Sequence, residues 1–326
     1  MRYRLLGASG ARVSEIGIGA FPLSGYTADA DGRRTGWSGS SDAQAVALIH
    51  RAEELGINLI DSAESYGNGH SEEVVGRALR GRRHRWLIAT KVTTNQGLSA
   101  GMADLEAAVR RRIHGAAEAS LRRLGSDYID VYQLHALPLA GAEAAVLQAL
   151  MELKQRGLVR LIGVSSNDVA AIRGLAALGD VDVLQVGYNL IERQGAATLD
   201  YARDAGMGTL IRVPLAKGML SGKYFTNWEL PADDVRHERF SRAATVRSFR
   251  RLPELRFLAE GRTMPQAALR FTLDHPGTSC VIAGAKTVAQ IEENAAASEV
   301  PALSAAELQR ALPIVEGLSV PNWAGN

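Results

Sequence analysis

Four side chains that can move or hold a proton stand close to the ends of apolar runs. Such runs end at Asp61 and at Lys91, a third ends just before His135, and Tyr66 follows Asp61 by five residues. A lysine cation near a phenol stabilises the phenolate and so makes the phenol a better acid. A histidine beside them could donate a hydrogen bond to a carbonyl oxygen and orient it. Together these groups could protonate an oxygen while a second reagent attacks the adjoining carbon.

This chemistry needs a partner, because no protein side chain supplies a hydride. A nicotinamide cofactor would supply it, and the first interpretation is therefore a reductase that acts on an aldehyde or ketone. A second interpretation uses Lys91 as the nucleophile of a Schiff-base aldolase or lyase, although Asp61 would keep that lysine charged. Each residue taken alone could also be an ordinary polar group at a strand end.

A repeating pattern of short apolar runs, turns and helical stretches must position the four residues. Most of the runs are apolar on both faces, as strands of a buried parallel sheet are. In the helical stretch 41–56, Ser41 or Asp42 can cap the start and Gly56 can take the left-handed position at the end. The predicted strands are residues 13–19, 57–61, 86–91, 128–134, 160–165, 181–187, 208–213 and 278–284, and the other helices include residues 104–124, 142–156, 196–205 and 286–297.

Eight units of strand followed by helix predict an α/β fold, a (β/α)8 TIM barrel, with active residues at the C-terminal ends of its strands. Residues 2–14 indicate a β-hairpin around "GASG" that could cap the bottom of the barrel. Residues 20–41 and 218–245 form long loops, which a barrel places on its catalytic face. No linker interrupts the pattern, so residues 1–326 are expected to form a single domain.

A glycine-rich turn after Asp61 partly matches a dinucleotide-binding motif. Residues 67–72, "GNGHSE", supply the first two glycines of the pattern G-x-G-x-x-G. Glu72, however, stands where close packing of helix on strand needs Gly or Ala. Glu72 and Glu73 would also put negative charge where a pyrophosphate should bind. We interpret the stretch as a turn that aims Tyr66 over the barrel mouth and then begins a helix.

The composition argues against several other classes of protein. The 37 basic and 35 acidic residues nearly balance, so neither nucleic acid nor a membrane surface is expected as a partner. No stretch approaches the ~20 apolar residues of a membrane span, and the N-terminus does not resemble a secretory signal. Cys280 is the only cysteine, which favours a cytoplasmic location. No metal is expected, because the spacing of His114, His237 and His275 is not that of metal ligands.

The chain resembles the aldo-keto reductases, of a bacterial type with long loops, in motif order and spacing over nearly its whole length. This resemblance implies a catalytic tetrad of Asp61, Tyr66, Lys91 and His135. The matching stretches are "LGASGARVSEIGIGAF", "LIDSAESYGNGHSEEVVGRAL", "IATKV", "DVYQLH", "IGVSS", "LQVGYNLIE", "VPLAKGMLSGKY", "PADDVRHERF" and "IAGAKTVAQIEEN".

The same resemblance implies residues for the nicotinamide end of a bound NADP(H). Tyr188 would stack on the nicotinamide ring, while Gln185 and Ser165 would bind its carboxamide. The family usually has Asn where this chain has Ser166, so the contact from that position is open. Asn167 follows as a candidate helix cap. Tyr188 could alternatively be a core aromatic residue.

The phosphate and adenosine ends are expected near the last two strands. By the resemblance, Lys286 and Thr287 would bind the 2′-phosphate, and a helix N-terminus beside a lysine also favours an anion on physical grounds. This favours NADPH over NADH, although Lys286 could instead be a solvated surface charge. The other implied cofactor residues are Ala20, Phe21, Asp61, Val213, Leu215, Lys217, Gly218, Lys223, Gly284, Gln290, Glu293 and Asn294.

The substrate remains open at this level. Phe21, Tyr26 and Trp37 are candidates for substrate contact together with Tyr66 and His135, but the first three could equally pack within their loop. A third interpretation of the chain is an NADPH-binding regulatory subunit with little turnover, like the potassium-channel β-subunits that share this fold. The sequence does not decide which small carbonyl compound is reduced, in which direction the reaction runs, or the oligomeric state.

Overall fold

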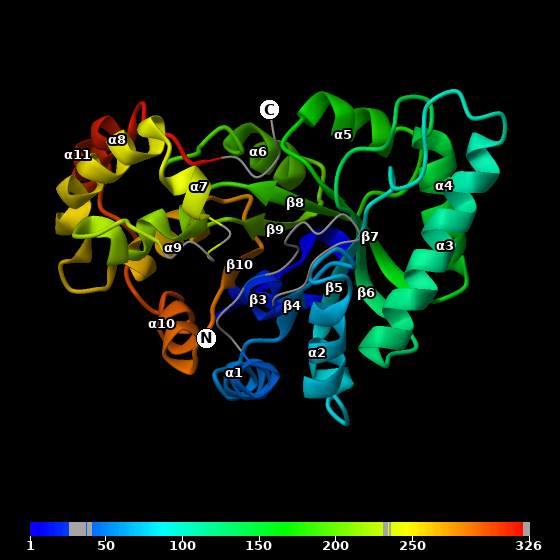
Figure 1. The fold of residues 1–326 in the computed structure, drawn as a ribbon, viewed down its shortest axis with the longest axis horizontal. Helices are drawn as coiled ribbons and strands as arrows, with labels where there is room; N and C mark the ends of the chain where they lie inside the picture. The colour runs from blue at the N-terminus through cyan, green and yellow to red at the C-terminus, as the bar shows by residue number, and fades with distance from the viewer. Residues whose placement is uncertain (26–36, 38–40, 231–233, 235, 322–326) are drawn as a thin grey trace.

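A closed parallel barrel forms the centre of the molecule. The computed structural model describes residues 1–25, 37, 41–230, 234 and 236–321. Within them eight strands close in the order β10-β3-β4-β5-β6-β7-β8-β9 (Figure 1). The strands are β3 (Ile16–Gly19), β4 (Leu59–Asp61), β5 (Leu87–Val92), β6 (Ile129–Leu134), β7 (Val159–Ser165), β8 (Val183–Gly187), β9 (Gly208–Arg212) and β10 (Cys280–Gly284). The predicted (β/α)8 barrel is confirmed, whereas the single domain over 1–326 stays a prediction.

Helices between the strands cover the barrel, and their ends follow the capping signals of the sequence. α1 begins at a capping box in which Ser41 accepts a hydrogen bond from the Gln44 backbone, and Gly56 just beyond its end has φ 85°. The helices that follow the barrel strands include α1 (Asp42–Glu54), α2 (His70–Ala78), α3 (Leu105–Leu124), α4 (Glu143–Gln155), α5 (Val169–Ala176), α6 (Ala196–Asp204), α9 (Met264–Leu273) and α10 (Val288–Ala296). Of the described residues, no helix is both long enough and apolar enough to cross a bilayer.

The N-terminal hairpin closes the bottom of the barrel, as predicted. β1 (Tyr3–Leu5) pairs antiparallel with β2 (Arg12–Ser14). Leu6 between them is fully buried in the apolar cluster that fills the lower barrel. Gly208 at the start of β9 makes room for it, because a Cβ there would lie 2.6 Å from Leu6 Cδ1. The predicted strand 13–19 is therefore divided, with Ser14 in the hairpin and Ile16–Gly19 in the barrel.

The segment predicted as a long loop at 218–245 is partly helical. It contains η5 (Lys223–Phe225), α7 (His237–Phe240) and the start of α8 (Ala243–Arg251). Tyr224, Phe240 and Phe249 pack together there, with ring centroids 4.9–5.7 Å apart. Figure 1 shows α7 and α8 beside α11 (Ala305–Val315), at one side of the barrel. These helical segments are too short for the helical period of apolar residues to be visible in the sequence.

Candidate active site

A buried ion pair lies at the C-terminal ends of β4 and β5. Lys91 Nζ lies 2.6 Å from Asp61 Oδ2 and donates a second hydrogen bond, of 2.7 Å, to the Ser62 carbonyl oxygen. Lys91 is fully buried and Asp61 is 2% exposed. Burial acts to lower the pKa of Lys91, but the charges and hydrogen bonds of Asp61 and Tyr66 together outweigh it and raise that pKa. The lysine therefore stays charged at neutral pH.

Two glutamine side chains complete the shell around Asp61. Gln133 Nε2 on β6 and Gln185 Nε2 on β8 donate to Asp61 Oδ1 at 2.9 and 2.8 Å. Gln185 was predicted as a carboxamide ligand, and this role stays a prediction; in the structure its side-chain amide bonds the carboxylate. Gln133 was not singled out in the sequence, although its position two residues before His135 gives it the same strand face. Both glutamines are at most 2% exposed, so the carboxylate is held from three strands.

Tyr66 lies beside this ion pair, where the sequence predicted it. Its hydroxyl is 3.3 Å from Lys91 Nζ. The turn that carries it needs glycine at position 67, where φ is 59° and a Cβ would lie 2.5 Å from the Ser24 carbonyl oxygen. The Phe21 ring packs edge-on against Tyr66 at 5.0 Å between centroids. The glycines of the turn thus aim the phenol at the lysine.

His135 stands on the other side of Tyr66. Its ring centroid is 5.7 Å from that of Tyr66, and its Nδ1 is 3.3 Å from Ser65 Oγ. Burial, with the positive charges of Lys91 and Arg212, lowers the pKa of His135 to about 3. The imidazole is therefore neutral at physiological pH and can donate one hydrogen bond.

The cofactor residues predicted after the last strands cluster at the ends of β9 and β10. Val213 and Leu215 follow β9 and lead into η4 (Ala216–Ser221), which carries Lys217 and Gly218. Burial lowers the pKa of Lys217 to about 8, and the cations of Arg212 and Arg239 contribute. Gly284 ends β10, and Thr287 caps α10, the helix that carries Gln290, Glu293 and Asn294.

Two aromatic residues predicted near the substrate connect this region to the tetrad. The Trp37 ring lies edge-on to Phe21, with centroids 5.5 Å apart. Lys286 Nζ lies 4.9 Å from the centre of the Trp37 ring. Ala20 donates its backbone N–H to the Asp61 carbonyl oxygen. Tyr26, the remaining candidate, lies outside the described residues.

Tyr188 is placed differently from the prediction. Its ring stacks on Phe271 at 5.4 Å, meets His275 edge-on at 5.4 Å, and is 7% exposed. It therefore packs in the layer between strands and helices, as a core aromatic residue does. The alternation of β8 explains this place, because Gln185 and Gly187 face into the barrel and the next residue faces out. The stacking role given to Tyr188 stays a prediction, and these contacts favour the alternative of a core aromatic residue.

The residues between β7 and α5 are also engaged in other contacts. Ser166 Oγ accepts a hydrogen bond from the Asp168 backbone, and Asp168 rather than Asn167 caps α5. The Asn167 side chain instead bonds both the N–H and the carbonyl of Gly187 at 2.8 Å. Ser165, at the end of β7, is partly exposed. Of these residues, Ser165 is the one whose side chain makes no hydrogen bond within the described residues.

The motif "GNGHSE" is a structural turn. Glu72 is fully buried, binds Arg123 Nη2 at 2.6 Å and accepts a hydrogen bond from Thr90. Gly69, with φ 92°, precedes α2 as its N-cap residue. The glutamate therefore ties α2 to α3 and β5.

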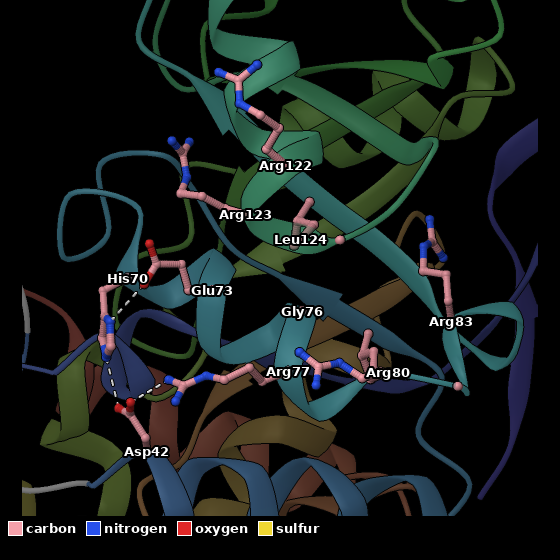
Figure 2. Close-up of a pocket in the computed structure, with 13 residues that line it drawn as sticks. Asp42, His70, Glu73, Gly76, Arg77, Arg80, Arg83, Arg122, Arg123 and Leu124 are labelled. Atoms are coloured by element: carbon pink, nitrogen blue, oxygen red, sulfur yellow. Dashed lines mark hydrogen bonds and ion pairs between the residues drawn. The ribbon is translucent and has the colours of Figure 1, made fainter.

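A second group of charges lines a hollow of about 530 Å³ on the outer wall between α2 and α3 (Figure 2). Asp42 sits between His70 and Arg77 and bonds both of them. Arg80 and Arg122 are exposed at its rim. None of the predicted catalytic or cofactor residues lines this hollow.

The fold and the mouth define a barrel enzyme with a buried lysine–carboxylate pair beside a tyrosine. The model of the aldo/keto reductase family matches residues 17–314. Aldo-keto reductase YhdN from Bacillus subtilis is 32% identical over 307 residues, which cover 90% of this chain and 87% of that protein. The chain therefore belongs to the aldo-keto reductase family, a class of oxidoreductases.

Solved structures agree with this assignment. Aldo-keto reductase AKR11C1 from Bacillus halodurans, in its holo form, is 29% identical with a TM-score of 0.75, and the match covers 96% of each chain. An aldo/keto reductase from Klebsiella pneumoniae, solved in complex with NADP and acetate, is 25% identical with a TM-score of 0.70. That match covers 100% of this chain and 98% of the other.

Proposed function

We propose that this enzyme reduces an aldehyde or ketone to an alcohol with NADPH, with Tyr66 as the general acid. The observation that carries the proposal is the position of the Tyr66 hydroxyl, 3.3 Å from the Lys91 ammonium group. That ammonium is itself fixed by Asp61 and by the Ser62 carbonyl. A fixed cation beside a phenol stabilises the phenolate that remains after the proton has left.

Each member of the site then has a defined part. Tyr66 gives its proton to the carbonyl oxygen as the carbon is reduced. Lys91 stabilises the resulting phenolate, and Asp61 holds Lys91 in its charged form. Because His135 is neutral, it donates a hydrogen bond to the same oxygen without competing as an acid. When bound, the nicotinamide supplies the hydride.

The residues after β9 and β10 fit an anionic dinucleotide. Lys217 is a partly buried cation whose pKa is lowered by burial and by neighbouring cations, so a phosphate close to it would be favourable. Asn294 Nδ2 is buried and has no hydrogen-bond partner among the described residues. We propose that Lys217, Lys286 and Thr287 hold phosphate groups, and that Asn294 lies toward the adenosine.

The Schiff-base alternative is disfavoured by the state of Lys91. A nucleophilic amine must lose its proton, yet the Asp61 charge raises the pKa of Lys91. The three contacts of Nζ, to Asp61, Ser62 and Tyr66, also match its three protons. A regulatory subunit with little turnover would keep the same contacts and is separated from the reductase by measuring turnover.

Tyr66→Phe tests the proposal directly. We expect kcat for carbonyl reduction, followed by the loss of NADPH absorbance, to fall by about 10²–10⁴-fold. NADPH affinity and the thermal midpoint should stay close to wild type, because only one hydroxyl is removed. Full activity in Tyr66→Phe would refute the role of the phenol. If wild type turns over no carbonyl compound, a regulatory subunit with little turnover is favoured instead.

Lys286→Met tests the choice of cofactor. If Lys286 binds the 2′-phosphate, the Kd for NADPH should rise by about tenfold while the Kd for NADH changes little. An equal change for both cofactors would refute this role.

The enzyme is proposed to work in the cytoplasm on a small-molecule carbonyl substrate, in keeping with its one buried cysteine.

A further inference from the structure

Arg212 brings a cation into the mouth of the barrel. It is the last residue of β9 and lies opposite Gly187 in the register of β8 and β9. Gly208 and Leu210, four and two residues earlier, face the lower barrel, so the alternation of the strand turns Arg212 inward as well. A Cβ on Gly187 would lie 3.1–3.2 Å from the guanidinium carbon and its two terminal nitrogens. The glycine therefore leaves the space that the guanidinium fills.

The charge of Arg212 acts on both groups proposed to handle the carbonyl oxygen. It contributes to the lowered pKa of His135, and it is attracted by a negative charge on Tyr66. Burial lowers the pKa of Arg212 itself, but a guanidinium remains charged at neutral pH. A cation thus faces the same space as the proposed acid and hydrogen-bond donor.

This guanidinium has no anionic partner within the described residues. Its Nε is buried and makes no hydrogen bond, and it forms no ion pair with Glu192, the carboxylate that attracts it. By contrast, the buried Arg236 binds Asp234 at 2.7 Å, and the buried Arg270 binds Asp274 at 2.8 Å. Because a buried charge without a partner is costly, a site that keeps one is suited to an anionic ligand.

We propose that Arg212 binds an anionic group of the substrate, so that the enzyme prefers carbonyl compounds with a carboxylate or phosphate near the carbonyl. This inference rests on the proposed function and adds the substrate class. The planar fork of a guanidinium matches either anion through two parallel hydrogen bonds. With the anion on Arg212, the carbonyl oxygen lies toward Tyr66 and His135.

Matched substrate pairs test the preference. One pair is benzoylformate and its neutral methyl ester, and the other is glyceraldehyde 3-phosphate and glyceraldehyde. We expect wild type to have the higher kcat/KM for an anionic member, and the pair that shows it identifies carboxylate or phosphate. Arg212→Gln should lower that value by about 100-fold or more, with less than about threefold change for the neutral member. Arg212→Lys should be intermediate, and Arg122→Gln on the outer wall should match wild type.

A binding measurement decides the point without turnover. Benzoate and inorganic phosphate are titrated calorimetrically into the enzyme saturated with NADP⁺. Wild type should bind one of them, and Arg212→Gln should lose that binding while NADP⁺ affinity and thermal midpoint are kept. The inference is overturned if wild type binds neither anion, if Arg212→Gln binds as wild type does, or if the variant loses NADP⁺ instead. Lack of turnover with every carbonyl would refute the proposed function, but the titration would still decide the role of Arg212.

Discussion

The barrel mouth and the outer-wall hollow both gather charges, but only the mouth buries them. In the mouth, Asp61 and Lys91 are at most 2% exposed and every polar atom of the carboxylate is bonded. In the hollow, Asp42 bonds His70 and Arg77 at a partly exposed position, and Arg80 and Arg122 lie in solvent. Arg77 lowers the pKa of Asp42 through their hydrogen bond, but water screens much of this interaction.

The difference shows that burial, and not the number of charges, distinguishes the candidate active site from the hollow. A buried cation cannot be satisfied by water, so each of its neighbours is fixed in place. The hollow has more arginines, yet Arg77, Arg80 and Arg122 are exposed and can be satisfied by solvent. Substitutions in the two regions should therefore differ steeply in their effects.

The largest effect is expected for Lys91→Met. It leaves the buried Asp61 carboxylate without its cation, which should cost about 3–5 kcal/mol of unfolding free energy and abolish measurable reduction. Urea denaturation and NADPH oxidation give the two values. The double variant Asp61→Asn/Lys91→Met removes both charges and should regain most of the stability without activity. A Lys91→Met protein as stable as wild type would contradict the role of burial.

A smaller loss is expected when one amide donor to Asp61 is removed. Gln185→Leu should reduce the unfolding free energy by about 1–3 kcal/mol, since the carboxylate loses a buried hydrogen bond. Gln133→Leu should act similarly, and the double variant should be non-additive because both donors serve Oδ1. Gln148→Leu, at an exposed site on α4, is the matched control and should change the unfolding curve little.

The third test uses pH. The pKa of His135 is about 3 in the folded enzyme, below its ordinary value of 6.5, so the unfolded chain binds the extra proton first. Stability linked to this group is complete above about pH 6.5 and is lost as pH falls toward 3. Between pH 7 and pH 4, wild type should therefore lose about 1–3 kcal/mol more than His135→Asn. The exposed His84→Asn should keep the wild-type slope, and equal slopes for all three proteins would contradict the assignment.

The smallest effects are expected in the hollow. Arg80→Gln and Arg122→Gln remove exposed charges and should shift the thermal midpoint by no more than about 2 °C. Their kcat/KM should stay within about twofold of wild type. A large loss of kcat/KM in either variant would show that the outer wall takes part in the reaction, as the barrel mouth is proposed to do.

Much of the site follows from the sequence because barrel topology brings strand ends together. Asp61, Lys91 and His135 each follow an apolar run, and the closed strand order places them at one mouth. The contacts of Gln133 and Gln185 with Asp61 depend on side chains crossing the barrel interior, which no local pattern records. The alternation along β8, however, could have placed Tyr188 outside. The short helices within 218–245 lack a full period of apolar residues, so the sequence predicts a loop there.

The N-terminal hairpin has a consequence for the order in which the chain folds. Leu6 is buried together with Leu210 on β9 and Cys280 on β10, which are more than two hundred residues further along the chain. Such distant pairings form slowly, because long stretches of chain must be ordered first. The floor of the barrel can therefore close only after β9 and β10 have been synthesised. Protection of the hairpin amides from exchange would then report the last step of assembly.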